Sequence, residues 1–221
     1  MPRCLLTGRF GTGRRTLIQT FAKGSPLNDA ELNPDYRPSV IADAVVGSPS
    51  VFTPAGELVS DSSLVVGEPM SLNEFSGGSE YYTKTRPVGY RDRDVILVCF
   101  SVVDRASFGS IREDADPRGP GLGWAPELKK YSPGTPFLLV GLKTDLRPID
   151  AAAAEVVTAE EGVALAEEIG ASKYLECSAY TYDGVVAVFT EAERLHVLVS
   201  TGAVFAQEAE PQASGSSCAV Q

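Results

Sequence analysis

The 221-residue sequence has few basic residues, few cysteines and no long apolar run. Its 19 lysines and arginines stand against 29 aspartates and glutamates, which gives a formal net charge of -10. Nucleic-acid binding generally requires a basic face that neutralises phosphates, so this balance argues against nucleic-acid partners. Four cysteines are too few for a disulfide framework in a chain of this length, and we expect a reducing, cytosolic setting.

Features that would direct a chain into a membrane or out of the cell are also scarce. No apolar stretch approaches the roughly 20 residues that a membrane-spanning helix requires. The beginning of the chain, Met-Pro-Arg-Cys-Leu-Leu-Thr-Gly, becomes glycine-rich too early for a secretory signal. The only histidine, His196, lies in a stretch of helical periodicity, and we expect it at the edge of the core rather than in a metal site.

Three apolar runs bounded by turn or polar residues predict strands, at residues 94–103, 136–141 and 173–178. The first two runs are continuous rather than alternating, which is typical of strands covered on both faces in a parallel sheet. Cys99 and Cys177 lie inside these runs, and we expect them to be small buried side chains.

Two stretches carry helical patterns. Residues 158–170 are expected to form a helix with Thr158 as the N-cap, and Glu161 follows at the spacing of a capping box. Apolar residues recur at helical spacing from 184 to 200, and Asp183 stands where an N-cap is expected. Strands that alternate with helices predict one α/β domain with a mostly parallel sheet.

Two stretches rich in Ser, Pro and Gly show neither periodicity. Residues 42–61 and 113–123 are therefore expected to be loops or insertions. Residues 201–221 are rich in Gln, Glu, Ala, Ser and Gly and are expected to be a disordered tail, which leaves residues 1–200 as the folded domain.

A glycine-rich stretch, Gly8-Arg-Phe-Gly-Thr-Gly-Arg-Arg-Thr16, lies between an expected first strand at residues 3–6 and a helical stretch. Its spacing is similar to the phosphate-loop pattern G-x-x-x-x-G-K-[ST], whose backbone N–H groups bind phosphates. Arg14 stands at the lysine position and Arg15 at the Ser/Thr position, and a register with Thr16 as the hydroxyl would put arginines at both glycine positions. The candidate phosphate-binding residues are Gly8, Gly11, Thr12, Gly13, Arg14, Arg15 and Thr16. The alternative is a glycine-rich strand-to-helix turn that binds nothing.

Two later motifs follow predicted strands and resemble the guanine-binding motifs of small GTPases. Gly141-Leu-Lys-Thr-Asp145 is similar to N/T-K-x-D, and Glu176-Cys-Ser-Ala179 is similar to E-x-S-A. The resemblance implies that Asp145 accepts hydrogen bonds from guanine, that the Lys143 stem lies along the base, and that a backbone N–H of the second motif binds the guanine carbonyl. The implied guanine-binding residues are Lys143, Asp145, Ser178 and Ala179.

Three stretches, residues 86–90, 131–141 and 173–179, resemble the Rho branch of this family, and the chain is identified as a divergent Rho-type small GTPase. The resemblance implies a P-loop NTPase fold, a three-layer α/β fold with a six-stranded, mostly parallel sheet. It also implies GTP or GDP at the carboxyl ends of the strands. Protein effectors or regulators would contact two switch segments, here near residues 37–40 and 81–86.

The first switch segment differs from the family pattern at the residue that would contact the base and resembles it at the residue that would bind the metal. Leu32 replaces the aromatic residue that stacks on guanine. Ser39 stands at the position of the threonine that binds Mg²⁺, and its hydroxyl could still do so.

The second switch segment, residues 74–80, departs further. Phe75 or Ser76 replaces the aspartate behind the metal, depending on a one-residue gap. Gly78 keeps the amide that would contact the γ-phosphate, whereas Ser79 replaces the glutamine that orients water.

These replacements predict weak or absent hydrolysis, because phosphoryl transfer depends on positioning and charge stabilisation. We still expect GTP or GDP to bind, without dependence on Mg²⁺, because the base-binding half is intact and Arg14 and Arg15 supply positive charge. The alternative is a nucleotide-free pseudo-GTPase that acts as a membrane-associated protein-binding module. A metabolic P-loop kinase is disfavoured by the guanine motifs and the missing lysine.

The last four residues, Cys218-Ala-Val-Gln221, match a C-a-a-X box, and glutamine at X points to farnesylation of Cys218 with later methylation. From Phe205 onward the chain has no lysine or arginine, so the basic patch that usually assists a single lipid is missing. We therefore expect reversible exchange between the cytosol and the cytoplasmic face of membranes.

Overall fold

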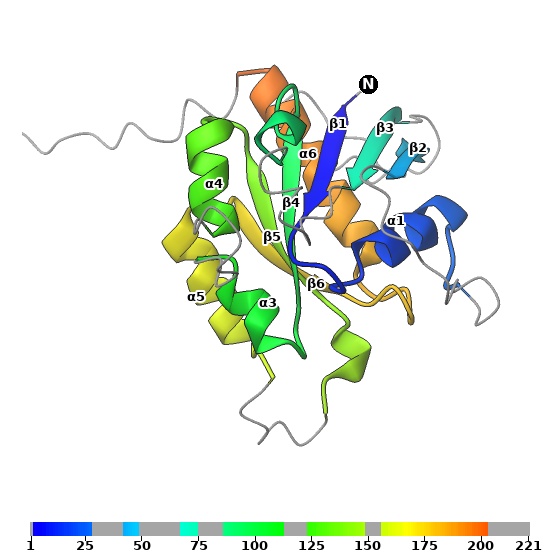
Figure 1. Ribbon diagram of the computed structural model, residues 1–221. Coiled ribbons are helices and arrows are strands. Elements are labelled where there is room, and N and C mark those ends of the chain that lie inside the picture. Colours follow the sequence, from blue (N-terminus) through cyan, green and yellow to red (C-terminus); the bar gives the residue numbers. More distant parts are fainter. Residues whose placement is uncertain are drawn as a thin grey trace, which may run out of the picture.

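A computed structural model describes residues 2–27, 42–48, 67–74, 86–112, 123–148 and 156–202. The elements in chain order are β1 (Arg3–Thr7), α1 (Arg14–Lys23), β2 (Ala42–Ser48), β3 (Gly67–Glu74), β4 (Val95–Ser101), α3 (Arg105–Gly109), α4 (Trp124–Tyr131), β5 (Phe137–Leu142), the 3-10 turn η1 (Thr144–Leu146), α5 (Ala159–Ile169), β6 (Lys173–Cys177) and α6 (Val185–Ser200). Strands alternate with helices through most of this order, which confirms the predicted α/β class (Figure 1).

The six strands form one sheet in the order β2-β3-β1-β4-β5-β6. All neighbouring pairs are parallel except β2 and β3, which are antiparallel. The expected six-stranded, mostly parallel sheet is confirmed. The carboxyl ends of the parallel strands β1, β3, β4, β5 and β6 therefore lie at the same edge, and ligands of open α/β sheets generally bind at such an edge.

Helices cover both faces of the sheet, so the fold has three layers (Figure 1). On β4, alternate residues such as Leu97 and Cys99 pack with α1 and α6, whereas Ile96, Val98 and Phe100 pack with α3, α4 and α5. Every residue of β4 is buried, which explains why this strand has a continuous apolar sequence.

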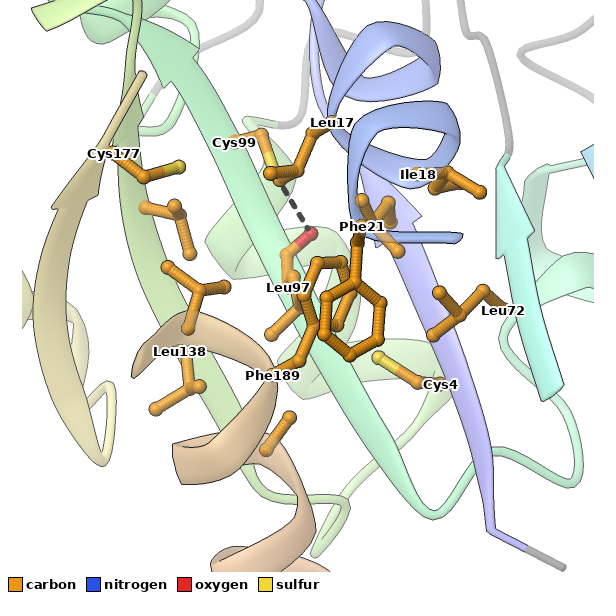
Figure 2. Packing of buried hydrophobic residues seen from close by; sticks show 14 of the residues in the cluster. Cys4, Leu17, Ile18, Phe21, Leu72, Leu97, Cys99, Leu138, Cys177 and Phe189 are labelled. Carbon is orange, nitrogen blue, oxygen red and sulfur yellow. Dashed lines mark hydrogen bonds between the residues drawn. The ribbon is translucent and has the colours of Figure 1, made fainter. Parts of the chain in front are cut away.

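Three cysteines belong to the core between the sheet and the pair α1 and α6. Cys4, Cys99 and Cys177 are all buried. Figure 2 shows Cys4 beside the stacked rings of Phe21 and Phe189, whose centroids lie 3.9 Å apart, and Cys99 beside Leu17. Burial raises the pKa of each thiol, that of Cys99 to about 12. The predicted role of Cys99 and Cys177 as small buried side chains is confirmed.

The expectation of a loop throughout residues 42–61 is wrong at its start, because Ala42–Ser48 forms strand β2. Its seven residues lack clean alternation, and no local pattern marks them as a strand. They are extended because their backbone pairs antiparallel with β3, from Ala42 opposite Glu74 to Ser48 opposite Gly67. Residues 49–61, 113–122 and 203–221 lie outside the described residues.

Both predicted helices are present, and one of them begins differently from the prediction. Thr158 and Glu161 form the predicted capping box at the start of α5. The N-cap of α6 is Gly184, in the left-handed conformation, rather than Asp183. Asp183 instead contacts the preceding turn, where its carboxylate accepts a hydrogen bond from the Thr181 hydroxyl at 2.8 Å. His196 is half-buried on α6, at the edge of the core as expected.

A buried ion pair ties the helical residues 86–89 to α4. Arg86 Nη2 lies 2.6 Å from Glu127 Oε2, and Arg86 Nε donates a hydrogen bond to Oε1 across 3.2 Å. Both side chains are 1% exposed, and the guanidinium lies 4.2 Å from the centroid of the Trp124 ring. The pair fixes the chain that precedes β4 against the outer helical layer.

None of the helices within the described ranges combines the length and apolarity needed to cross a bilayer.

Candidate functional site

The glycine-rich loop connects the carboxyl end of β1 to the start of α1, as predicted. Gly8 has a φ of +139°, and a Cβ atom at this position would lie 2.1 Å from the carbonyl oxygen of Cys99. Gly13, the N-cap of α1, has a φ of +104°. Glycine is therefore required at Gly8 because the loop passes directly against the backbone of β4.

The polar side chains of the loop and of the first turn of α1 differ in how deeply they are buried. Thr12 is buried, and its hydroxyl donates to the carbonyl of Arg9 at 3.1 Å. Arg15 and Thr16, in the first turn of α1, are half-buried. Among these residues Arg14 is the most deeply buried cation of the loop, with a side chain that is 2% exposed.

Arg14 faces a carboxylate that sequence analysis did not identify as part of the site. Its Nη2 lies 3.7 Å from Oε1 of Glu74, the last residue of β3, whose side chain is 4% exposed. The register of β1 and β3 places Glu74 opposite Leu6, next to the point where the glycine-rich loop begins. The family's switch pattern points to Phe75 and Ser76 rather than to Glu74. The sequence feature that could indicate Glu74 is a charged residue at the start of this switch segment.

Lys143 connects the end of β5 to the glycine-rich loop. Its backbone is in the left-handed conformation, with a φ of 65°, at the start of η1. The ammonium donates a hydrogen bond to the carbonyl of Gly11 at 2.6 Å, and a Cβ atom at Gly13 would lie 3.4 Å from the Lys143 Cε atom. The base motif and the phosphate loop are therefore in direct contact, as their shared edge of the sheet predicts.

Asp145 and Ser178 join the two segments that resemble base-binding motifs. The Ser178 hydroxyl donates to Oδ1 of Asp145 at 2.6 Å and accepts hydrogen bonds from the backbone N–H groups of Tyr180 and Thr181 at 3.1 and 3.0 Å. Ser178 is buried, whereas Asp145 is exposed, so the carboxylate is held from the protein side and remains accessible to a ligand.

Ala179 is anchored from α1. Its carbonyl accepts a hydrogen bond from the hydroxyl of Thr20, a buried residue, at 3.3 Å. Lys143, Asp145, Ser178 and Ala179, the four predicted guanine-binding residues, thus form one cluster beside the loop.

An ion pair behind this cluster holds η1 against β6. Arg147 donates to both carboxylate oxygens of Glu176, at 2.8 and 2.7 Å, and the Tyr174 hydroxyl donates to Oε1 at 2.6 Å. Burial acts to raise the pKa of Glu176, but the hydrogen bonds from Arg147 and Tyr174 and the charge of Arg147 outweigh burial, so the pKa lies below its ordinary value. Because Asp145 lies only two residues before Arg147, this ion pair also helps to hold Asp145 in place.

The described residues around the loop do not resemble a metal site. The Ser/Thr position carries the cation Arg15, and the Glu74 carboxylate faces Arg14. Nowhere in the described ranges do three or more His, Cys, Asp or Glu side chains gather as metal ligands. Ser39 and Gly78 lie outside the described residues, as do Cys218, residues 37–40 and most of 81–86.

A sequence model described as the Ras family matches residues 76–197. The match includes η1, β6 and the cluster around Asp145 and Ser178, and ends within α6.

Proposed function

The match spans more than half of the chain, so the protein belongs to the Ras family of small guanine-nucleotide-binding proteins, and on that premise we propose its finer function. It is a Rho-like signalling protein that binds GTP or GDP without dependence on Mg²⁺ and hydrolyses GTP weakly or not at all. Its partners are proteins that contact residues 37–40 and 81–86.

The observation that carries this proposal is the hydrogen bond between Ser178 and Asp145. A carboxylate held by one oxygen from the protein side presents acceptors to a ligand, and guanine has adjacent N1–H and amino donors. Lys143, two residues before Asp145, donates its ammonium to the Gly11 carbonyl and so joins this segment to the glycine-rich loop. These contacts resemble a built base-binding arrangement more closely than a surface turn, which would not need a buried serine to orient an exposed aspartate.

Weak hydrolysis is supported by the residues that surround the phosphate loop. Transfer of a phosphoryl group depends on charges that face the reacting oxygens, and removal of one such donor typically costs about 10²–10³ in rate. Here the lysine is replaced by Arg14, which faces Glu74, and Ser79 takes the position of the glutamine that orients water.

Nucleotide content of the purified protein tests the binding proposal. The protein, isolated from cells and then denatured, is expected to release GDP or GTP but not adenine nucleotides on chromatography. Added GDP is expected to bind equally well with Mg²⁺ and with a chelator. Failure to bind either guanine nucleotide or guanosine would overturn the proposal, and turnover at ordinary small-GTPase rates that depends on Mg²⁺ would overturn its second part.

A nucleotide-free protein-binding module is the second candidate function. It is favoured by the contact between Arg14 and Glu74, which supplies the loop cation with a counter-charge from the protein itself. The same nucleotide-content measurement separates the two candidates, since a module of this kind would release no nucleotide.

We extend the proposal to membranes through Cys218. A farnesyl group there would bind the bilayer reversibly, because one lipid without a basic patch gives only marginal affinity. The protein would then exchange between the cytosol and the cytoplasmic face of membranes.

A further inference from the structure

The phosphate loop contains a buried cation whose hydrogen bonds are made to the protein. Arg14 Nη1 donates to the carbonyl of Arg9 at 2.8 Å and to the Thr12 hydroxyl at 3.3 Å. A Cβ atom at Gly8 would lie 3.0 Å from the same nitrogen. The backbone of the loop therefore encloses the guanidinium on one side. The guanidinium belongs to the loop residue that would be expected to bind a ligand phosphate.

Glu74 closes the other side of this enclosure. It lies at the end of β3, is buried, and places Oε1 at 3.7 Å from Arg14 Nη2. Burial raises the pKa of the Glu74 carboxyl, and the charges of Arg14 and Arg15 oppose this shift. Because Glu74 has little contact with water, Arg14 is its principal source of charge compensation.

We propose that Glu74 acts as an internal counter-ion that retains Arg14 within the loop, so that nucleotide phosphates bind only in competition with the Arg14–Glu74 pair. The inference rests on the proposed guanine-nucleotide binding and specifies how the phosphate half of that site is regulated. Glu74 is thus a specificity-determining residue that limits how much affinity the phosphates add.

The physical reason lies in the cost of separating two buried charges. If Arg14 turned to a phosphate, the carboxylate of Glu74 would be left buried without its partner, which costs more than the pair contributes when intact. A phosphate must offset this penalty before it gains anything from Arg14. The phosphates of GDP and GTP are therefore expected to add less affinity than they would if Glu74 carried no charge.

The test compares guanosine, GDP and inorganic pyrophosphate as ligands of the full chain. The quantity of interest is the phosphate gain, defined as the ratio of the guanosine Kd to the GDP Kd. Glu74→Gln keeps the side-chain volume but removes the charge, and it is expected to raise the phosphate gain about 10- to 100-fold, the range of a charge-assisted hydrogen bond. Glu74→Asp, which keeps the charge, serves as the matched control and is expected to resemble the wild type.

A second variant tests the inference even if Glu74→Gln fails to fold. Arg14→Gln removes the cation for which Glu74 and phosphate compete and leaves the Glu74 carboxylate without its counter-charge, so it is expected to lower the phosphate gain. An unchanged gain would overturn the inference. The double variant Arg14→Gln with Glu74→Gln is expected to lose the increase seen in Glu74→Gln alone, and folding of each protein is followed by thermal unfolding.

Failure of the inference is distinguishable from failure of the proposed function. Guanosine binding with an equal phosphate gain in the wild type and Glu74→Gln overturns the inference alone. Pyrophosphate binding to Glu74→Gln but not to the wild type, without guanosine binding to either, upholds the inference and overturns guanine recognition. No binding of any of the three ligands to any variant overturns both.

Discussion

The hydroxyl of Ser178 donates a hydrogen bond to Oδ1 of Asp145 across 2.6 Å, although 33 residues separate the two along the chain. The contact is possible because η1 follows β5 and Ser178 follows β6, and these strands are adjacent and parallel. One carboxylate oxygen is thereby fixed by the fold.

Replacing Asp145 by asparagine is expected to weaken GDP binding about 10- to 100-fold, because an amide N–H₂ would face a donor on guanine. The same change is expected to favour xanthosine diphosphate, which carries a carbonyl where guanine has its amino group. Competition binding with GDP and xanthosine diphosphate measures the change in nucleotide preference. An Asp145→Asn protein that still prefers GDP would contradict the assignment.

Gly8→Ala is expected to destabilise the fold by about 3 kcal/mol or more, because the left-handed backbone and the nearby Cys99 carbonyl both oppose a Cβ atom. Gly109→Ala is the matched control. A Cβ atom at Gly109 meets nothing within 4 Å, so the free energy of unfolding should stay unchanged or rise by up to about 1 kcal/mol. Urea denaturation of both variants measures the difference, and equal stabilities would show that the Gly8 contact is unimportant.

Stability is expected to fall in acid partly through Glu176. Its folded-state pKa lies below the ordinary value, so its contribution is present above a pH of about 4.3 and is lost as the pH falls through the folded-state pKa. Glu176→Gln should lower the free energy of unfolding by about 1 kcal/mol at pH 7, with a smaller difference in acid. Denaturation curves across pH check this, and a difference that grows in acid would contradict it.

Breaking the buried pair of Arg86 and Glu127 by replacing either side chain is expected to cost about 3–5 kcal/mol, because the remaining charge stays buried without the ion pair. The double variant Arg86→Met with Glu127→Leu removes both charges and should cost much less than the sum of the two single changes. Chemical denaturation of Arg86→Met, Glu127→Leu and the double variant measures the coupling free energy between the two side chains. Additive losses would mean that the two side chains act independently.

Cys218→Ser is expected to abolish lipid attachment and to move the protein from membranes to the cytosol. Mass spectrometry of the protein from cells checks the modification, and fractionation checks the distribution. An unchanged distribution would contradict the proposed role of the lipid.

Much of the candidate base-binding cluster could be predicted from sequence because its residues follow adjacent buried strands. Lys143, Asp145 and Ser178 each come just after an apolar run, and parallel strands bring such positions together. Glu74 could not be placed in the same way. Its role depends on the register of β3 against β1 and on the direction of the Arg14 side chain. The spacing of residues in the sequence indicates neither of them.

Strand β2 and the pair Arg86–Glu127 also depend on distant partners. Residues 42–48 are extended because β3 supplies the ladder, and a sequence without alternation gives no sign of that pairing. Arg86 and Glu127 are separated by 41 residues and look like surface charges when each is considered alone.

Burial of Cys4, Cys99 and Cys177 makes the fourth cysteine a single chemical handle. Maleimides attack the thiolate, and thiols enclosed by the sheet with raised pKa values react slowly in the folded protein. A maleimide fluorophore added under native conditions is therefore expected to leave these three thiols unlabelled, so that labelling would report a Cys218 that lacks the proposed lipid. The fraction of lipidated protein in a preparation could then be read from fluorescence without changing any residue.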